Sequence, residues 1–174
     1  LNIGSGLDRG YTGSVKIVGQ EVSGMTRTEL SEFRRRRLGF VFQSYNLFPA
    51  LTAVENVEFT SIVRGDSRSA ARIAAIRALG DVGLADKIDA HPRHLSGGQQ
   101  QRVAVARAIA SRPDIIFADE PTANLDSKTG EGLISLFKQL NRELGLTFVF
   151  STHDRELIAQ VDREIRIRDG QLLT

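Results

Sequence analysis

The fold class of this chain is decided by two short segments, residues 95–102 (LSGGQQQR) and residues 115–120 (IIFADE). The first places a serine and two glycines where a helix begins, and such a turn can present backbone N–H groups and a hydroxyl to an anion. The second is a short apolar strand that ends in two carboxylates, which can bind a metal ion and activate a water molecule. Together, in this order, the segments indicate chemistry on a nucleotide phosphate.

Length and composition fit a single globular domain. The 174 residues are 41% hydrophobic and 25% charged, which is ordinary for a chain with a sizeable core. A net charge of +2 is too small to indicate a partner nucleic acid. Cysteine is absent, which excludes disulfides and thiolate metal sites and fits a cytoplasmic location. No apolar run approaches the roughly 20 residues that a membrane-spanning helix needs.

Strand and helix patterns alternate along most of the chain, which predicts an α/β domain with a mainly parallel sheet. The apolar runs and the 3.6-residue periodicity predict strands at 15–18, 38–42, 114–118 and 146–151, and helices at 28–37, 99–111 and 129–144. Thr28 is expected to cap the first of these helices. Alternating Ile165 and Ile167, followed by Asp169 and Gly170, predict a terminal hairpin.

Between residues 51 and 84 only helical periodicity is found. Val54, Val57 and Ile62 are expected to face inward on one helix, and Ile73, Ile76 and Leu79 or Gly80 on the next. The stretch therefore predicts a helical subdomain.

A run of four arginines occupies residues 34–37. Because cations are favoured near a helix C-terminus, a solvated helix end explains this run. Contact with anionic lipid headgroups or with a partner is the alternative.

Polar side chains follow the ends of three expected strands: Gln43, the pair Asp119 and Glu120, and His153. Ligands of parallel sheets bind beyond the carboxyl ends of the strands, so these residues predict a site at that edge. Burial of unpartnered carboxylates is costly, and Mg²⁺ would supply the partner of Asp119. Glu120 could then act as general base toward water. Taken alone, Gln43 and His153 are also explained as a loop residue and a structural histidine.

These residues resemble the ATP-binding subunit of ABC transporters, and the resemblance covers nearly the whole chain. The wording ADEPTANLDS at residues 118–127 is similar to the branch that includes lipoprotein-releasing and macrolide-exporting ATPases. The resemblance implies a P-loop NTPase-like (RecA-like) fold, which has a mainly parallel sheet, an inserted α-helical subdomain and a small antiparallel β element, here incomplete at the N-terminus. Residues 1–174 would form a single ABC ATPase domain fragment, with a helical subdomain at about 51–95 and the α/β core and β elements at 1–50 and 96–174.

The resemblance also implies residue roles in binding ATP and Mg²⁺. The γ-phosphate of an ATP molecule held by the opposite subunit would be bound by Ser96, Gly97, Gly98 and Gln99. Asn124, Leu125 and Asp126 resemble the D-loop, which crosses the dimer interface, and Asp126 is expected to contact the nucleotide.

At the strand ends, the resemblance makes Glu120 the general base and Asp119 a ligand of Mg²⁺, usually through water. Gln43 would touch Mg²⁺ and water, and His153 would contact the γ-phosphate. In the same comparison, Tyr45, Leu47 and Phe48 form an apolar surface for the membrane subunit; the alternative is that they are ordinary core residues.

Such ATPases need a glycine-rich phosphate loop, G-x-x-x-x-G-K-[ST], ahead of the other motifs. The nearest approach is residues 19–26 (GQEVSGMT), where Met25 stands in place of the lysine. A thioether carries no charge for a phosphate, so we interpret this run as a turn after a strand. Because the chain also begins with Leu1 rather than Met, we expect it to be the C-terminal part of a longer protein.

The predicted function is that of an ATP-binding and hydrolysing subunit that powers an ABC transporter, with ATP bound between two head-to-tail domains. Its partners would be a second copy or a paired ABC ATPase domain, and an integral membrane transporter subunit. Its location would be cytoplasmic, peripheral on the inner face of the cell membrane. Without a phosphate loop, residues 1–174 alone are expected to have negligible ATPase activity.

Two alternatives stand beside this function. One is a catalytically deficient nucleotide-binding or regulatory module that lacks the phosphate loop. The other is a chromosome or DNA-repair ATPase, but that class needs a very long coiled coil between Gln43 and residue 95. Here about 50 positions separate them, without sustained heptads.

Overall fold

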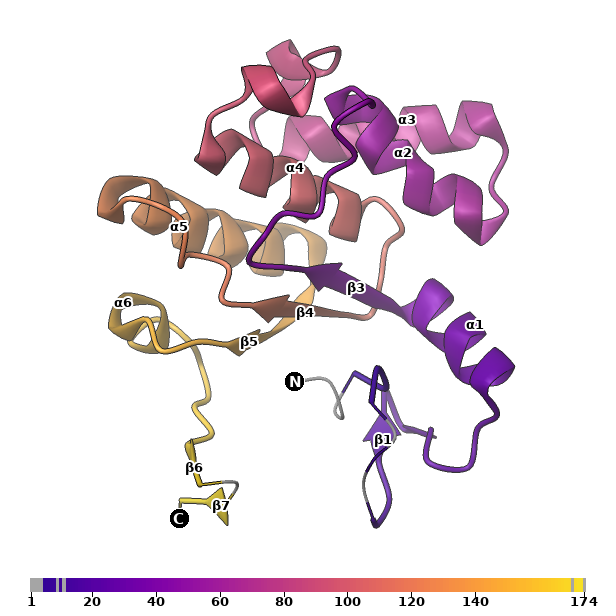
Figure 1. The fold of residues 1–174 in the computed structure, drawn as a ribbon, viewed down its shortest axis with the longest axis vertical. Coiled ribbons are helices and arrows are strands. Elements are labelled where there is room, and N and C mark those ends of the chain that lie inside the picture. Colours follow the sequence, from indigo (N-terminus) through magenta and orange to yellow (C-terminus); the bar gives the residue numbers. More distant parts are fainter. Residues whose placement is uncertain (1–4, 9, 11, 170, 174) are drawn as a thin grey trace.

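A parallel three-stranded sheet in the order β3-β4-β5 lies at the centre of the protein (Figure 1). Its strands are β3 (Leu38–Val41), β4 (Ile115–Asp119) and β5 (Thr147–Ser151). The computed structural model describes residues 5–8, 10, 12–169 and 171–173. The helices that it describes are α1 (Arg27–Arg37), α2 (Ala53–Arg64), α3 (Arg68–Asp81), α4 (Gly97–Ile109), α5 (Ser127–Leu144) and α6 (Arg155–Ile158), with 3₁₀ turns η1 (Ala85–Lys87) and η2 (Pro92–His94).

Both faces of β4 are covered by apolar side chains, as expected for the middle strand of a parallel sheet. Ile116 and Ala118 point to one face and are fully buried, whereas Phe117 points to the other and is nearly so. β4 pairs in register with both neighbours, so that Ala118 lies opposite Val41 on one side and Phe150 on the other. The three strands therefore end at the same edge of the sheet.

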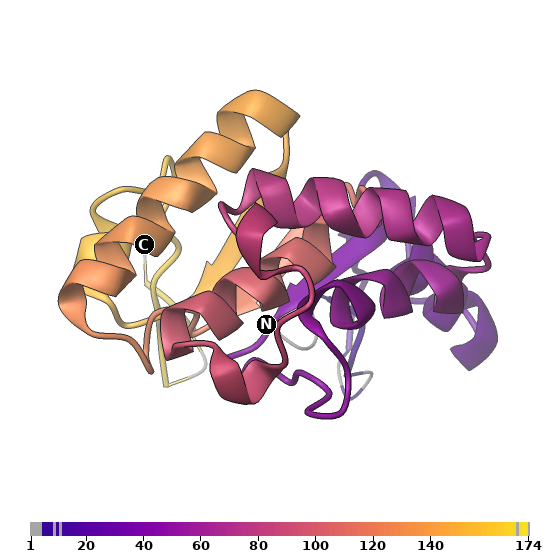
Figure 2. The same cartoon turned by 90° about the horizontal axis from the view of Figure 1, so that it is seen from above.

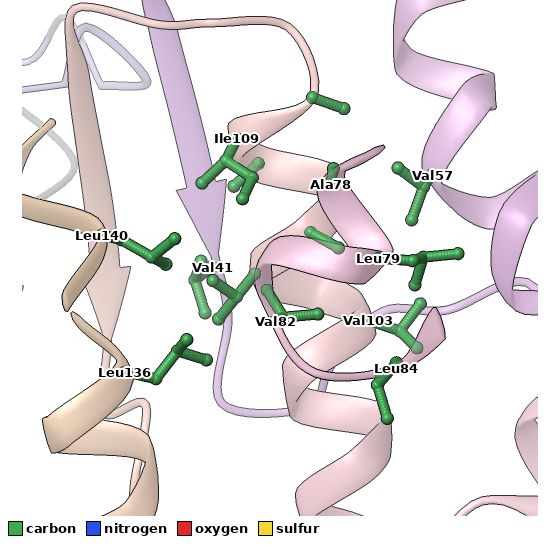
Figure 3. Close-up of a cluster of buried hydrophobic side chains, with 14 of the residues drawn as sticks. Val41, Val57, Ala78, Leu79, Val82, Leu84, Val103, Ile109, Leu136 and Leu140 are labelled. Carbon is green, nitrogen blue, oxygen red and sulfur yellow. The ribbon is translucent and has the colours of Figure 1, made fainter. Parts of the chain in front are cut away.

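One face of the sheet is covered by α4 and α5, and α2 and α3 pack on the far side of α4 (Figure 1). The view from above shows α5 to one side of the α2–α3 pair (Figure 2). The main apolar cluster joins these layers (Figure 3), and its buried residues include Val41, Val57, Ala78, Leu79, Val82, Val103, Ile109, Leu136 and Leu140. Helix α4 thus lies between the sheet and the α2–α3 pair.

A second apolar cluster lies on the opposite face of the sheet. Leu30 and Phe33 of α1 pack there with Leu38 and Phe117, and Met25 packs against them. The antiparallel strands β1 (Lys16–Ile17) and β2 (Gln20–Glu21) contribute Ile17 to the same cluster, and they replace the single strand expected at 15–18. Residues 19–26, which lack the lysine of a phosphate loop, therefore form strand β2 and place Met25 against the second apolar cluster.

The N-cap of α1 is Thr26, two residues before the expected Thr28, and the helix begins at Arg27 rather than at residue 28. The Thr26 hydroxyl accepts a hydrogen bond from Glu29 N, and the Glu29 carboxylate accepts one from Thr26 N, which completes a capping box. The arginine run forms the last turn, where the cations oppose the negative end of the helix dipole. Its guanidinium groups bind within the chain, to Gly6 O, Val63 O, Glu32 and Asp114.

The inward face expected for the second helix of the 51–84 stretch is only partly right: Leu79 is fully buried, but Ile73 and Ile76 are not. Ile73 is 70% exposed and Ile76 is also exposed, whereas Ala71 and Ala75 are fully buried. Because α3 packs closely against both α2 and α4, its alanines fill most of the interface together with Leu79. Ile62 on α2 is likewise exposed, although Val54 and Val57 are buried as expected.

The expected terminal hairpin is present as β6 (Ile167–Arg168) paired antiparallel with β7 (Gln171–Leu172). Gly170, the second residue of its expected turn, lies outside the described residues. Within the described ranges, none of the helices has the length and apolarity needed to cross a membrane.

Candidate functional site

The polar residues predicted at the strand ends do lie at one edge of the sheet. Asp119 is the last residue of β4 and pairs with Ser151, the last residue of β5. Gln43 and His153 follow the ends of β3 and β5 by two residues each. The in-register pairing therefore brings three chain segments that are far apart in sequence to one place.

Glu120 is held in a fixed geometry directly after β4. Its backbone is in the left-handed region, with φ at +43°, and its N–H donates to Ser151 O over 2.9 Å. One carboxylate oxygen, Oε1, lies 2.7 Å from His153 Nδ1, and the other accepts a hydrogen bond from Thr152 Oγ1 over 3.2 Å. Strained backbone of this kind persists where the surroundings fix it, and it often marks functional sites.

His153 pairs with Glu120 from the solvent side. Its side chain is 86% exposed, whereas that of Glu120 is only 24% exposed. The hydrogen bond that His153 makes to Glu120 and the negative charge of that carboxylate raise the pKa of His153 above its ordinary value. The imidazolium form is therefore favoured next to the carboxylate, and it orients one of the two carboxylate oxygens.

Asp119 has the properties of a magnesium ligand. It is half-buried, and among the described residues no hydrogen bond or ion pair engages its carboxylate. The described residues contain no cluster of three or more acidic, histidine or cysteine side chains. Such a cluster is not needed, because Mg²⁺ commonly takes one or two protein oxygens and fills its other positions with water and phosphate. The oxygens of Asp119 and Gln43 fit that requirement.

Ser96 begins α4 as its N-cap. Gln99 N donates to the Ser96 hydroxyl over 3.3 Å, and Gln99 Oε1 accepts from Ser96 N over 2.9 Å. This capping box engages the two polar side chains that were predicted to bind phosphate. Both are accessible at the helix N-terminus, where backbone N–H groups and the helix dipole favour an anion.

The two glycines of this segment also have a packing role within the chain. A methyl group added at Gly98 would collide with the Thr129 methyl on α5, and one added at Gly97 would lie 3.1 Å from the Tyr45 hydroxyl. The start of α4 is therefore pressed against both α5 and the loop after β3. Close approach between these elements requires glycine even before any ligand is considered.

The loop after β3 is held by a buried arginine. Tyr45 and Asn46 have positive φ values of 60° and 50°, and Arg107 of α4 donates to both of their carbonyl groups, over 2.8 Å to Tyr45 O. Arg107 is 9% exposed, and burial lowers its pKa. From the other side, Asn124 Nδ2 donates to Gln43 O over 3.0 Å. Gln43 therefore starts a loop that is tied to α4 and to residue 124.

Asp126 is the N-cap of α5. Its carboxylate accepts hydrogen bonds from Thr129 Oγ1 over 2.7 Å and Thr129 N over 3.1 Å, and these bonds lower its pKa. The preceding segment is joined to the end of β5 by a hydrogen bond of 2.6 Å from Thr122 Oγ1 to Asp154 Oδ2. The acidic group predicted to contact nucleotide thus stays ionised and fixed in orientation.

The structure joins Glu120 to His153 by a hydrogen bond, with Asp119 directly before Glu120, and it ties the Gln43 backbone carbonyl to Asn124, four residues after Glu120. Ser96–Gln99 lies beside the same loops, since Asn124 O is 4.0 Å from the position of a Gly97 methyl group. Sequence reasoning missed Thr152, Gln101 and Arg107. Gln101 and Arg107 are buried polar residues on α4, and helical periodicity assigns polar residues to the solvent side.

Comparison with known proteins identifies the family of the chain. Residues 1–123 match the protein family described as "ABC transporter". The chain belongs to the ABC transporter family. It is 47% identical over 172 residues to the uncharacterized ABC transporter ATP-binding protein YbbA of Escherichia coli K12. The match covers 99% of this chain and 75% of YbbA.

Other ABC proteins are similar over the same range. The lipoprotein-releasing system ATP-binding protein LolD of Porphyromonas gingivalis is 46% identical over 174 residues, which is all of this chain and 80% of LolD. The macrolide export ATP-binding/permease protein MacB of Rhodopirellula baltica is 43% identical, but the match covers only 25% of MacB. Likeness to LolD and MacB confirms the branch that the segment at 118–127 indicated.

A solved structure shows the same fold. The dimeric, post-hydrolysis ATP-binding cassette MJ0796, which is bound to ADP and phosphate, superposes with a TM-score of 0.86 at 43% identity. The match covers 98% of this chain and 75% of that one. The α/β, P-loop NTPase-like fold class predicted from the sequence is thereby confirmed for this ABC ATP-binding chain.

The packing role of Gly98 can be tested by a pair of substitutions. Gly98→Ala should lower the free energy of unfolding by about 1–3 kcal/mol, because the added methyl group overpacks the α4–α5 contact. Thr129→Ser removes the opposing methyl group and keeps the hydroxyl that binds Asp126. The double variant should recover most of the loss in urea denaturation. Equal losses in the single and double variants would show that this contact is not the reason for glycine.

The Glu120–His153 pair predicts a pH dependence. Because the pKa of His153 is raised in the folded state, the contribution of the pair to stability is complete below about pH 6.5 and is lost as pH rises through the folded-state pKa. An NMR titration should place the pKa of His153 above about 6.5, and Glu120→Gln should lower it toward that value. His91 and His94 serve as internal controls. An unchanged His153 pKa in the variant would contradict the pairing.

Proposed function

We propose that this ABC protein acts as the ATP-hydrolysing engine of a transporter, with Glu120 as general base. The observation that carries the proposal is the two-point hold on the Glu120 carboxylate by His153 and Thr152 at the end of a buried strand. A general base must be aimed at the proton it takes, and both carboxylate oxygens of Glu120 have a partner that sets their direction. Glu120 combines these two contacts with partial burial, since its side chain is only 24% exposed.

ATP and Mg²⁺ are the proposed cofactors. Asp119 and Gln43 would hold Mg²⁺ with their oxygens, and the ion would neutralise charge that develops on the phosphates. His153 would contact the γ-phosphate through the ring nitrogen that does not face Glu120. The support is chemical: oxygen donors, a carboxylate without a partner among the described residues, and an imidazole whose pKa is raised by its carboxylate partner lie at one edge of the sheet.

A second ATP-binding domain completes the proposed site. Ser96, Gly97, Gly98 and Gln99 would bind the γ-phosphate of ATP held by the opposite subunit, and Asp126 would approach the nucleotide across the same interface. The exposed N-terminus of α4 and the dimeric state of the similar cassette MJ0796 support this head-to-tail arrangement. The partner would be a second copy of this chain or a paired ABC ATPase domain.

The proposed partner that ATP hydrolysis drives is an integral membrane transporter subunit. The proposed location is therefore the cytoplasm, peripheral on the inner face of the cell membrane. Tyr45, Leu47 and Phe48 would contribute to the docking surface. Phe48 is exposed and stacks edge-on against the exposed Phe59 of α2 at 4.9 Å, which supports this role. Tyr45 and Leu47 are half-buried, and Leu47 also packs against the main apolar cluster.

We further propose the domain division as follows. Residues 51–95 form a helical subdomain, and residues 1–50 and 96–174 form the α/β core and β elements of a single ABC ATPase domain fragment. The mutual packing of α2 and α3, and their position on the outer side of α4, support this division. Residues 19–26 lack the lysine of a phosphate loop, so we assign turnover to a longer chain that carries one.

The proposed role of Glu120 as general base predicts the effect of replacing its carboxylate by an amide. In a longer chain that carries the phosphate loop, Glu120→Gln should keep ATP binding and lower kcat by about 10²–10⁴-fold, because the amide cannot accept the proton. Phosphate release and binding of a fluorescent ATP analogue measure the two effects. Residues 1–174 alone should release negligible phosphate. Turnover near the unmutated rate in the variant would refute the role of Glu120.

The shared site predicts that Ser96 controls dimer closure. Ser96→Arg places a bulky side chain at the N-terminus of α4, where the opposite nucleotide would bind, and should abolish the ATP-stabilised dimer in size-exclusion chromatography of a Glu120→Gln background. Ser135→Arg, at an exposed position of α5, is the matched control and should leave the dimer intact. Persistence of the dimer in the Ser96 variant would count against the arrangement.

A further inference from the structure

Gln101 is a buried polar residue that the proposed chemistry does not use. It lies on α4, five residues after Ser96, and is fully buried. Its Nε2 donates a hydrogen bond of 2.8 Å to Pro121 O, whereas its Oε1 is buried without a hydrogen-bond partner among the described residues. A buried oxygen without a hydrogen-bond partner is rare and costs free energy. The presence of glutamine here therefore indicates that the hydrogen bond donated by Nε2 has a function.

The carbonyl that Gln101 grips belongs to the residue directly after Glu120. Glu120 has a positive φ, and proline fixes the backbone that follows it. On the β5 side, the Glu120 N–H is tied to Ser151 O. On the α4 side, Gln101 ties the next carbonyl. The backbone of Glu120 is therefore fixed from two different elements, one on each side of the residue.

Helix α4 connects the Gln101–Pro121 hydrogen bond to the serine–glycine segment, Ser96–Gln99. The same helix begins at Gly97, with Ser96 as its N-cap. Since a helix is stiff over one turn, the position of Ser96 and that of the Pro121 carbonyl are coupled through Gln101. A second buried polar residue of α4, Arg107, makes the corresponding contact with the loop that begins at Gln43.

We propose that Gln101 is a positioning residue for Glu120. It fixes the peptide after the general base relative to α4, so that the Glu120 carboxylate is aligned when the serine–glycine segment is in place. The inference rests on the proposed role of Glu120 and adds a residue that holds it. Gln101 itself touches neither nucleotide nor water in this proposal.

Two substitutions in the longer, phosphate-loop-carrying chain test the proposal. Gln101→Met keeps the length and removes both the donor and the unpaired oxygen, so the variant should fold. Its kcat should fall by about 10–100-fold, because misplacement of a catalytic group by a fraction of an ångström is costly, while its KM for ATP stays within about twofold. Gln139→Met, on the exposed face of α5, is the matched control and should change neither constant.

Gln101→Glu supplies a signature that a purely structural residue would not give. The protonated carboxylic acid can donate to Pro121 O, whereas the carboxylate cannot. Relative to the unmutated protein, kcat of this variant should rise as pH falls from 9 to 6, whereas the ratio for Gln101→Met should stay flat. Melting temperatures measured across the same pH range separate recovery of activity from recovery of folding.

Each outcome decides the proposal. A folded Gln101→Met variant with kcat within twofold of the unmutated value overturns it, and so does a Gln101→Glu variant whose pH profile matches that of Gln101→Met. If Gln101→Met does not fold, the pH profile of Gln101→Glu decides alone. Retained turnover in Glu120→Gln would instead overturn the proposed function, whereas loss there with full activity in Gln101→Met overturns only the role of Gln101.

Discussion

Parallel pairing of β4 with β3 on one side and with β5 on the other determines where the polar residues of the candidate site lie. Because the pairing is in register, with Ala118 between Val41 and Phe150, the three strands end together. The apolar side chains of β4 are buried on both faces, so a shift of one residue would move them and the carboxylates that follow. The register that buries the apolar side chains of β4 therefore also fixes the position of Asp119 and Glu120.

Helix α4 adds the second constraint, and it does so with polar groups. It lies between the sheet and the α2–α3 pair, begins at the serine–glycine turn, and carries Gln101 and Arg107 into the interior. Each of these side chains binds backbone carbonyls of a loop that leaves the sheet, next to Glu120 in one case and to Gln43 in the other. A rearrangement of α4 therefore affects both loops. Because α4 begins at the serine–glycine segment, which is proposed to bind the ATP of the opposite subunit, it couples that segment to the loops at Gln43 and Glu120, which are proposed to bind the ATP of this subunit.

Sequence patterns predicted the sheet and its edge well, because β4 is a continuous apolar run that ends in carboxylates and because parallel strands share an edge. Periodicity failed where packing is tight: in α3 the alanines face inward and Ile73 faces solvent, since the helices approach closely. It also failed for Gln101 and Arg107, whose polar side chains are buried because loop carbonyls need donors. The resemblance predicts phosphate binding for the glycines at 97 and 98, and the structure adds their close approach to Tyr45 and Thr129. No local pattern reveals such contacts between distant segments.

The central claim is that the shared edge of β3, β4 and β5 surrounds a triphosphate and its divalent cation. A crystal structure of the longer, phosphate-loop-carrying protein with a non-hydrolysable ATP analogue and Mn²⁺, located by anomalous scattering, tests this claim most directly. The account predicts Mn²⁺ within reach of the oxygens of Asp119 and Gln43, directly or through one water molecule, and the γ-phosphate beside His153. A metal ion bound elsewhere, with the Glu120–His153 pair facing away from the nucleotide, would contradict it.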